Sequence, residues 1–232
     1  MPNDAKDQSW TILCDFDGTI SAIDVTDALL ISFAQDGWED VEAAWRDGKI
    51  GSQQCMAAQV ALLDVDRAEL DARIAEIEID PAFGAFVAKA RDLGIALGVV
   101  SDGLDYVIAS ILNRHGLGDL PIDANALVQV SDRRWRLDFP NARADCTKAS
   151  GTCKCALLEE AGHNRRVLFI GDGASDFCVS HRADFVLAKG RLLDYAYAQG
   201  IPHAAIMGFG DALKWLKTLE VRPSATALSP VC

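Results

Sequence analysis

Asp15 and Asp17 stand two residues apart directly after an apolar run, a spacing that could turn two carboxylates toward one reacting group. The run, residues 10–13, is typical of a buried strand, and Gly18-Thr19 is typical of the turn that ends it. Ligands of open α/β sheets bind at the carboxyl ends of the strands, so both carboxylates are predicted to line a ligand site. Two close carboxylates repel unless a cation lies between them, and hard oxygen ligands suit Mg²⁺.

Two further apolar runs end in polar residues. Residues 95–100 form the first of them and lead into Ser101, which places a hydroxyl at a second strand end. Residues 166–170 form the other and lead into a glycine-rich turn that carries Asp172 and Asp176. Because the carboxyl ends of parallel strands share one edge of a sheet, these groups are predicted to meet Asp15 there.

Lys154 supplies the positive charge that such a site needs. It precedes a helical pattern over residues 155–161, which predicts an ammonium group at a helix N-terminus, a natural place for an anion. A carboxylate is a poor nucleophile toward a phosphate dianion because the two repel each other. A divalent cation and a lysine would neutralise that charge, so the pattern favours phosphoryl transfer.

The order of these motifs resembles the haloacid dehalogenase superfamily of phosphotransferases, and the resemblance runs over essentially the whole chain. It implies that Asp15 attacks phosphorus and forms an aspartyl-phosphate. Asp17 would protonate the leaving alcohol and then activate water. Ser101 and Lys154 would hold phosphoryl oxygens.

The same resemblance implies a Mg²⁺ site. Asp172 would complete the metal shell together with the side chain of Asp15 and the backbone carbonyl of Asp17. Asp176 would support this shell and orient Lys154. The predicted substrate-binding residues are Gly18, Thr19, Asp24, Gln59, Asp102 and Gly103.

The elements that position these groups predict a Rossmann-like α/β fold, with a doubly wound, mostly parallel sheet and an inserted helical cap after the first strand. Residues 1–20 and 81–221 would form the catalytic core. Residues 21–80 carry helical patterns only and would form the cap, which closes over a catalytic edge as lids do. A helical appendage without bearing on the site is the alternative. Residues 222–232 are predicted to be disordered.

The second half of the chain adds the remaining strands. Residues 121–130 and 134–137 are typical of a short strand and a β-ribbon. Residues 185–188 and 203–207 are typical of the last short strands, each followed by a helical sequence. This alternation of strands and helices favours a parallel sheet with helices on both faces.

The cap decides which leaving group is held. Asp24 stands where phosphoserine phosphatases carry an acid for the substrate amine, but Gln59 stands where they carry an arginine for the serine carboxylate. An amide cannot replace the two-pronged guanidinium, which speaks against serine recognition in that mode. Solvated surface arginines are the default interpretation of Arg46 and Arg67, although either could substitute for the missing arginine.

The resemblance is closer to the methionine-salvage phosphatases that act on 2-hydroxy-3-keto-5-methylthiopentenyl-1-phosphate. Their cysteine-bearing loop before the motif lysine is similar to residues 146–155 here, in a shorter version. Asp102 departs from their usual Ser-Gly-Gly and adds a negative charge near the expected phosphate. Phosphoserine phosphatase and a phosphate-binding module without turnover are the alternatives, and a phosphonatase would need Lys49 as its cap lysine.

Composition restricts the partners. The net charge is −12 and the sequence pI is about 4.7, so the surface repels nucleic acid and anionic lipid. A small phosphate ester is the expected partner, without nucleic acid or membrane, and the chain is expected to be cytoplasmic. The oligomeric state is left open.

Seven cysteines, an odd number, favour reduced thiols over a disulfide framework. Cys146, Cys153 and Cys155 cluster just before and after the motif lysine. Ordinary thiols in a loop are the default interpretation of this cluster, and structural zinc is the alternative.

Overall fold

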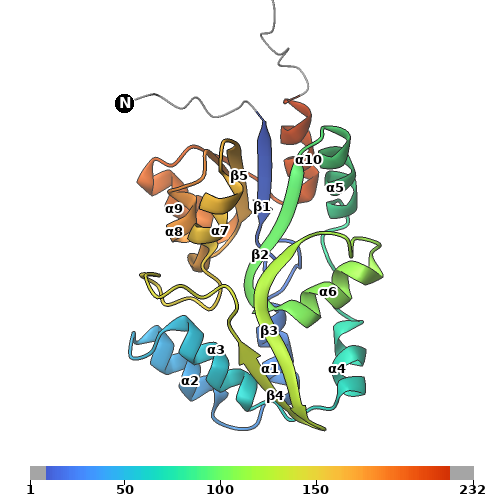
Figure 1. The fold of residues 1–232 in the computed structure, drawn as a ribbon, viewed down its shortest axis with the longest axis vertical. Coiled ribbons are helices and arrows are strands. Elements are labelled where there is room, and N and C mark those ends of the chain that lie inside the picture. The colour runs from blue at the N-terminus through green and yellow to red at the C-terminus, as the bar shows by residue number, and fades with distance from the viewer. Residues whose placement is uncertain (1–8, 220–232) are drawn as a thin grey trace, which may run out of the picture.

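The computed structural model describes residues 9–219 (Figure 1). A single sheet lies at the centre of this part of the chain. The strands within this range follow the order β4-β3-β2-β1-β5-β6-β7. All neighbouring strands pair in parallel except β3 and β4, which are antiparallel. The strands are β1 (Trp10–Cys14), β2 (Ala96–Leu104), β3 (Ile122–Ser131), β4 (Arg134–Asp138), β5 (Arg166–Gly171), β6 (Phe185–Ala188) and β7 (His203–Ala205).

The central strand β1 explains why the sheet needs helices on both faces. Ile12, Leu13 and Cys14 follow one another and all are buried, as expected of a parallel strand covered on both sides. Leu13 lies in register with Gly98 of β2 and Phe169 of β5. The strand ends of β1, β2 and β5 therefore lie side by side, and the predicted α/β fold is confirmed.

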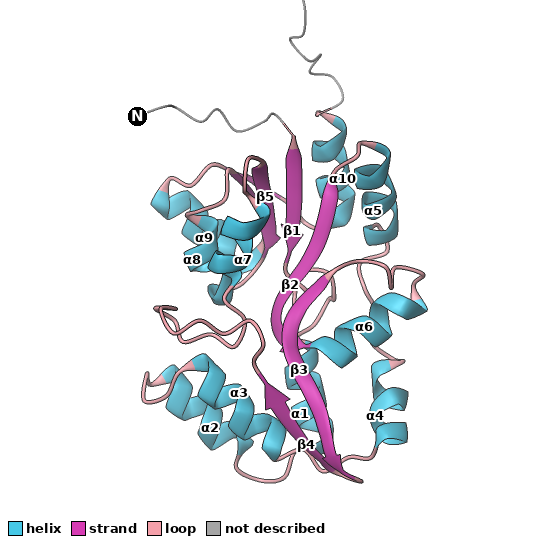
Figure 2. Cartoon of the chain, in the orientation of Figure 1, coloured by secondary structure: helices cyan, strands magenta, loops and turns pink. Residues whose placement is uncertain are grey.

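Helices cover the two faces of the sheet (Figure 2). One face carries α5 (Phe83–Asp92), α6 (Asp105–Arg114) and α10 (Phe209–Lys217). The other carries α7 (Lys154–Ala161), α8 (Phe177–Ser180) and α9 (Gly190–Gln199). Each face has its own hydrophobic cluster, in which Phe86 and Phe209 pack against each other on one side and Phe169 packs on the other.

The segment between β1 and α5 forms four helices beyond the carboxyl ends of the strands (Figure 1). They are α1 (Val25–Phe33), α2 (Trp38–Arg46), α3 (Ser52–Ala61) and α4 (Arg67–Ile74). Buried residues from α1, α3 and α4 join the hydrophobic cluster on the α5 and α6 face. The predicted boundaries, with residues 21–80 as the cap and residues 1–20 and 81–221 as the core, stay a prediction.

The β3–β4 ribbon contacts the segment of four helices, residues 21–80, that is predicted to be the cap. The indole N–H of Trp135 on β4 donates to the carbonyl of Val65 at 2.8 Å, and Arg133 pairs with Asp64 at 2.7 Å. Helix α3 packs along β4. Two segments that are far apart in the sequence thus form one structure around the ribbon.

Strand β2 continues past its predicted end at Val100 and runs through Ser101 to Leu104, with an irregular register against β3. Neighbouring side chains of a strand point to opposite sides. Ser101 and Asp102 therefore face different parts of the molecule. Strand β7 ends at Ala205, two residues before the predicted end.

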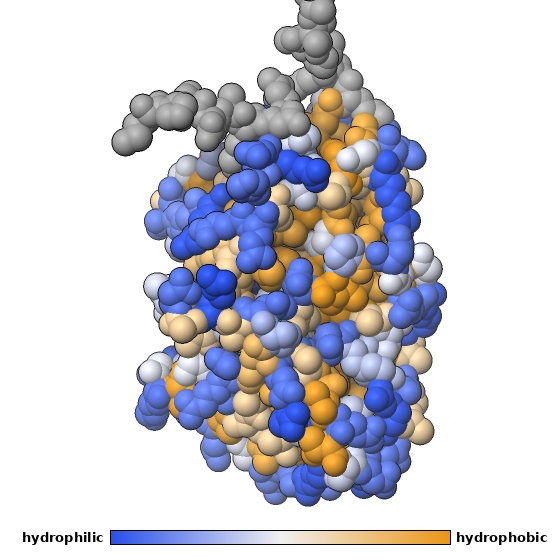
Figure 3. Space-filling model, in the orientation of Figure 1, coloured by the Kyte–Doolittle hydropathy of each residue, from blue (hydrophilic) through white to orange (hydrophobic). Residues whose placement is uncertain are grey.

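The surface shown in Figure 3 is hydrophilic over most of its rim, with an apolar band between α7 and α5 where β1 and β2 pass. Between residues 9 and 219, no helix has both the length and the apolar character that crossing a bilayer requires. The tail predicted to be disordered, residues 222–232, lies outside the described residues.

Candidate active site

Asp15 lies at the end of β1 and is almost fully buried, with 4% of its surface exposed. Its Oδ1 accepts a hydrogen bond from the backbone N–H of Phe16 at 2.8 Å and lies 2.7 Å from Nζ of Lys154. Gly18 follows in the left-handed region, with φ of 66°, and a Cβ there would lie 2.6 Å from Oδ2 of Asp172. The turn after β1 therefore requires glycine.

Lys154 is the first residue of α7, and 4% of its surface is exposed. Its ammonium lies 2.7 Å from Oδ1 of Asp15 and 2.7 Å from Oδ1 of Asp176. Burial opposes its charge, but the two carboxylates prevail and raise the pKa of Lys154 above its ordinary value. The lysine is thus a permanent cation between two acids.

Asp17 stands beside this group with its carboxylate held at both oxygens. Oδ1 accepts from the backbone N–H of Val25 at 2.7 Å, and Oδ2 accepts from the hydroxyl of Ser101 at 3.3 Å. Gly103 donates its N–H to the Ser101 oxygen at 2.9 Å, and a Cβ on Gly103 would lie 2.5 Å from Oδ2 of Asp17. Burial, with a contribution from repulsion by Asp24, raises the pKa of Asp17 to about 7.

Three carboxylates can hold a metal ion. Oxygen atoms of Asp15, Asp172 and Asp176 all lie within 4.8 Å of one another. Burial and repulsion by Asp176 raise the pKa of Asp15 and of Asp172, which means that an added cation would stabilise the ionised group. Because all three donors are hard oxygens, the group fits a cation such as Mg²⁺.

Asp176 holds the turn after β5 as well as the lysine. Its Oδ2 accepts from the backbone N–H groups of Asp172 at 3.1 Å and Gly173 at 3.3 Å, while its Oδ1 contacts Lys154. Its side chain is completely buried. Both oxygens of Asp176 are therefore engaged by the protein, which leaves Asp15 and Asp172 as the carboxylates of the group that can hold a metal ion.

Thr19 and Lys189 complete the surroundings of Asp172. The hydroxyl of Thr19 donates to Oδ1 of Asp172 at 3.1 Å, and Nζ of Lys189 donates to the carbonyl of Thr19 at 3.3 Å. Sequence reasoning missed Lys189, because it follows the short apolar strand β6 without any motif around it. It places a second ammonium group near Asp172 and lowers the pKa of that carboxyl, against burial and Asp176, which raise it.

The predicted cap residues form contacts within the cap. Asp24 is exposed and caps α1, where it accepts from the backbone N–H of Asp27 at 3.0 Å. Gln59 is buried and donates its amide to Oε2 of Glu42 at 3.1 Å, and Glu42 also pairs with Arg46. The Gln59 amide is thus held by an acid of the cap.

Asp102 turns away from Asp17, as the alternation along β2 requires. Its carboxylate accepts from the backbone N–H of Thr152 and from the hydroxyl of Ser52. Sequence reasoning missed Thr152 and its partner Asn125, which is fully buried on β3. A polar residue between Ala124 and Ala126 in an apolar strand was the available signal.

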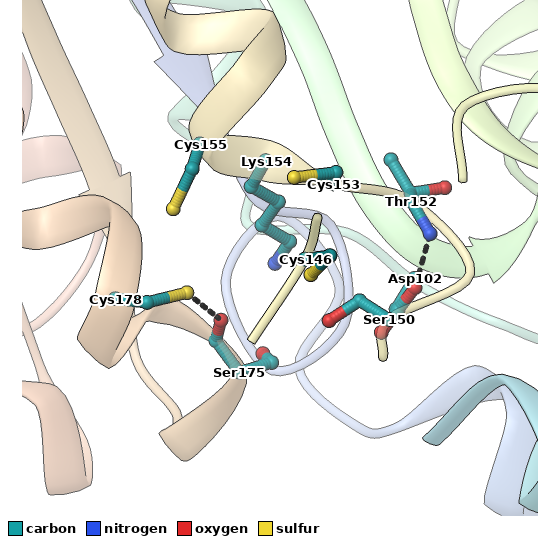
Figure 4. A pocket seen from close by; sticks show the side chains of 9 residues that line it. All are labelled: Asp102, Cys146, Ser150, Thr152, Cys153, Lys154, Cys155, Ser175 and Cys178. Carbon is teal, nitrogen blue, oxygen red and sulfur yellow. Dashed lines mark hydrogen bonds between the residues drawn. The ribbon is translucent and has the colours of Figure 1, made fainter. Parts of the chain in front are cut away.

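Four thiols line a small cavity beside Lys154 (Figure 4). They belong to Cys146, Cys153, Cys155 and Cys178, and Asp102, Ser150, Thr152 and Ser175 line the same cavity. A hydrogen bond from Cys155 lowers the pKa of Cys178 to about 6. In the described part of the chain, the group that could hold a metal ion consists of Asp15, Asp172 and Asp176 and includes none of these thiols.

The haloacid dehalogenase-like hydrolase family model matches residues 12–181. The chain belongs to this family, which confirms the predicted family and the predicted class of enzyme, a hydrolase. The predicted roles of the individual site residues stay predictions.

Curated relatives cover almost the whole chain. A 2-hydroxy-3-keto-5-methylthiopentenyl-1-phosphate phosphatase from Brevibacillus brevis is 32% identical over 215 residues, which are 90% of this chain and 96% of the relative. A protein of the same name from Geobacillus thermodenitrificans is 31% identical, with the same coverage.

Solved structures agree in fold. A phospho-aspartyl intermediate analogue of phosphoserine phosphatase matches with a TM-score of 0.68 and 19% identity, covering 90% of this chain and 99% of that chain. A substrate-bound phosphoserine phosphatase complex matches with a TM-score of 0.67, 19% identity and the same coverage. At this identity, the likeness concerns the fold alone.

Proposed function

We propose that the chain is a Mg²⁺-dependent phosphomonoester phosphatase that works through an aspartyl-phosphate on Asp15. The observation that carries this proposal is the buried contact of Lys154 with Asp15 and Asp176, each at 2.7 Å, beside the pair formed by Asp17 and Ser101. Nucleophile, acid, hydroxyl and cation come from three separate segments of the chain, because Asp15 and Asp17 share the turn after β1. Phosphoryl transfer needs such positioning more than it needs covalent chemistry by the protein.

In the first step, a carboxylate oxygen of Asp15 attacks phosphorus, and the bond from phosphorus to the leaving oxygen breaks. Lys154 neutralises charge on the nucleophile and on the phosphoryl oxygens, and the hydroxyl of Ser101 donates to one of those oxygens. Asp15, Asp172 and the backbone carbonyl of Asp17 would hold Mg²⁺, which supplies further charge neutralisation when bound. Asp176 keeps Lys154 in place.

Asp17 serves both half-reactions. Its raised pKa leaves a large fraction protonated near neutral pH, so it can donate its proton to the leaving alcohol. The carboxylate formed then takes a proton from water as the water oxygen attacks phosphorus. The bond from phosphorus to the Asp15 oxygen breaks, which releases inorganic phosphate and regenerates the Asp15 carboxylate. General acid–base catalysis of this kind contributes about 10²–10⁴-fold.

For the substrate, we propose a compound of the 2-hydroxy-3-keto-5-methylthiopentenyl-1-phosphate type. Support comes from the relatives of that name, which are about one-third identical over nearly their full length. The cap position expected to hold a substrate carboxylate carries Gln59, whose amide is already bonded to Glu42. An amide held by an acid is a poor site for the carboxylate of phosphoserine.

A substrate panel tests the proposal. Initial rates with Mg²⁺ are compared for 2-hydroxy-3-keto-5-methylthiopentenyl-1-phosphate, phosphoserine, sugar phosphates and an aryl phosphate, with an EDTA-treated sample of each as the control. The proposal expects the highest kcat/KM for the first compound and loss of turnover in EDTA. A higher kcat/KM for phosphoserine would mean that the proposed substrate is wrong and that the chain is a phosphoserine phosphatase. Absence of any hydrolysis would favour a phosphate-binding module.

Asp24→Asn is expected to move the alkaline limb of the kcat/KM profile to lower pH. Asp17 must be protonated to act as an acid, so the rate falls as pH rises through its pKa. Repulsion from Asp24 contributes to that raised pKa, and its removal lowers it. Because Asp24 is exposed, solvent screens the effect and the shift should stay below about one pH unit. A limb that does not move, measured in parallel with the parent, would contradict this electrostatic link.

A further inference from the structure

Asp102 follows Ser101 directly, but its carboxylate accepts hydrogen bonds from two other segments, of which Figure 4 shows the one from Thr152. Oδ1 accepts from the backbone N–H of Thr152 at 2.7 Å, and Oδ2 accepts from the hydroxyl of Ser52 at 3.3 Å. Thr152 belongs to the loop that leads into Lys154, and Ser52 is the first residue of α3. One side chain thus contacts both the cap and the lysine loop.

On the loop side, Asp102 belongs to a buried polar network. The hydroxyl of Thr152 donates to Oδ1 of Asn125 at 3.1 Å, and the amide of Asn125 donates to the carbonyl of Asp102. Thr152 and Asn125 are 1% and 0% exposed. A Cβ on Gly151 would lie 2.5 Å from Oδ1 of Asn125, so the loop is packed closely against β3. A fully satisfied buried network of this kind is rigid.

This network fixes the position of the first residue of α7, Lys154. The backbone N–H of Lys154 donates to the carbonyl of Thr152 at 3.0 Å, so a shift of Thr152 would move the lysine backbone. The ammonium of Lys154 must reach Asp15 and Asp176 together, each at 2.7 Å. A misplacement of about 1 Å at a reacting group can cost about 100-fold in rate.

On the cap side, the same loop contacts the N-terminus of α3. The backbone N–H of Gln53 donates to the carbonyl of Ala149 at 3.0 Å, and a Cβ on Gly51 would lie 2.9 Å from Cβ of Ala149. Ala149 has a φ of 46°, in the left-handed region that residues with a Cβ rarely adopt. Such a conformation persists only where the surroundings hold it, and here the cap contributes to those surroundings.

We infer that Asp102 is a positioning residue that couples closure of the cap to the placement of Lys154. With the cap closed, Ser52 contacts Asp102 and Gln53 contacts Ala149. The loop that contains Ala149 and Thr152 is then held both by the cap and by the network on β3. With the cap open, those two contacts are lost, and only the network on β3 holds the loop. The lysine is therefore placed best when the cap covers the site. This inference rests on the proposed function for its kinetic consequences only.

Amide hydrogen exchange, read residue by residue by NMR on the full chain, tests the coupling without any turnover. Asp102→Ala removes the acceptor for Thr152 and the link to Ser52, so exchange at the amides of Thr152 and Gln53 should accelerate about tenfold or more. Ser52→Ala removes one cap contact and leaves the acceptor for Thr152 in place, so exchange should accelerate at Gln53 and, to a smaller extent, at Thr152. Asp92→Ala, at an exposed carboxylate on α5, is the matched control and should change neither amide.

Kinetics provide the second readout, with Mg²⁺ and the best phosphomonoester of the panel. Asp102→Ala should lower kcat/KM about 10- to 100-fold, with a fall in kcat, because Lys154 is misplaced. Ser52→Ala should raise KM and lower kcat about two- to tenfold, less than Asp102→Ala does, because Asp102 still holds Thr152. Asp102→Asn keeps an oxygen that can accept from Thr152, and should restore most of kcat.

The outcomes separate this inference from the proposed function. Unchanged exchange at Thr152 and Gln53 in Asp102→Ala overturns the coupling, even if the parent is an active phosphatase. If Asp102→Ala does not fold, unchanged exchange at Thr152 in Ser52→Ala overturns it instead. An Asn variant as slow as the Ala variant overturns the hydrogen-bond assignment. A parent without phosphatase activity defeats the proposed function, and the exchange rates still decide the coupling.

Discussion

Asp15→Asn is expected to abolish turnover, with a loss of about 10⁴-fold or more, while the fold stays intact. The amide keeps the shape of the side chain and an oxygen for the N–H of Phe16, but it cannot form an acyl phosphate. Burial and repulsion from Asp176 raise the pKa of Asp15, so removal of its charge should not destabilise the chain. Initial rates and urea unfolding, followed by tryptophan fluorescence, measure both effects.

Asp132→Asn is the matched control for this variant. Asp132 is exposed in the turn between β3 and β4, and its substitution should leave both turnover and stability as in the parent. Substantial turnover by a clean preparation of Asp15→Asn would remove Asp15 as the nucleophile. Loss of the folded state would instead mean that its charge is needed to balance Lys154.

Lys154→Met is expected to lose turnover and also stability. The ammonium is buried between two carboxylates, and removal of one partner from a buried ion pair costs about 3–5 kcal/mol. The variant leaves Asp15 without the cation that lowers its pKa, so this pKa rises further above its unfolded value. A carboxyl group with a raised folded pKa destabilises the fold above its unfolded pKa. The loss in free energy of unfolding of Lys154→Met, relative to the parent, should therefore shrink as pH falls and Asp15 takes up a proton.

Lys49→Met is the control for the lysine. The side chain of Lys49 is 69% exposed and pairs with Asp47 in the cap, so its loss should change stability by less than about 0.5 kcal/mol. Its turnover should equal that of the parent, whereas a phosphonatase with a cap lysine would lose activity. Lys154→Met with parental rates would contradict the role of Lys154 in holding phosphoryl oxygens.

The strands that lead to Asp15, Ser101 and Asp172 could be predicted because each contains a continuous apolar run, the pattern typical of a strand buried on both faces. Lys154 could be predicted from the helical periodicity that begins beside it. Parallel pairing then brings the three strands together at one edge of the sheet, and Lys154 reaches that edge from the N-terminus of α7.

Contacts that depend on tertiary packing could not be predicted in the same way. Whether Asp102 faces the phosphate or the cap depends on whether β2 ends at Val100 or continues, and apolar periodicity does not locate a strand end to one residue. The ribbon over residues 121–137 was predicted, but an alternating pattern does not reveal that Trp135 packs on the cap. Gln59 was placed by alignment to a motif, and its bond to Glu42 depends on how α2 and α3 pack.

The union of the β3–β4 ribbon with the cap limits how specificity can be engineered in this chain. A chimera that receives residues 21–80 of a relative would keep Arg133 and Trp135 on the recipient ribbon, facing donor residues in place of Asp64 and Val65. A graft that preserves these two contacts must transfer residues 122–138 together with the four helices. For evolution as for design, the unit of exchange is therefore discontinuous in sequence.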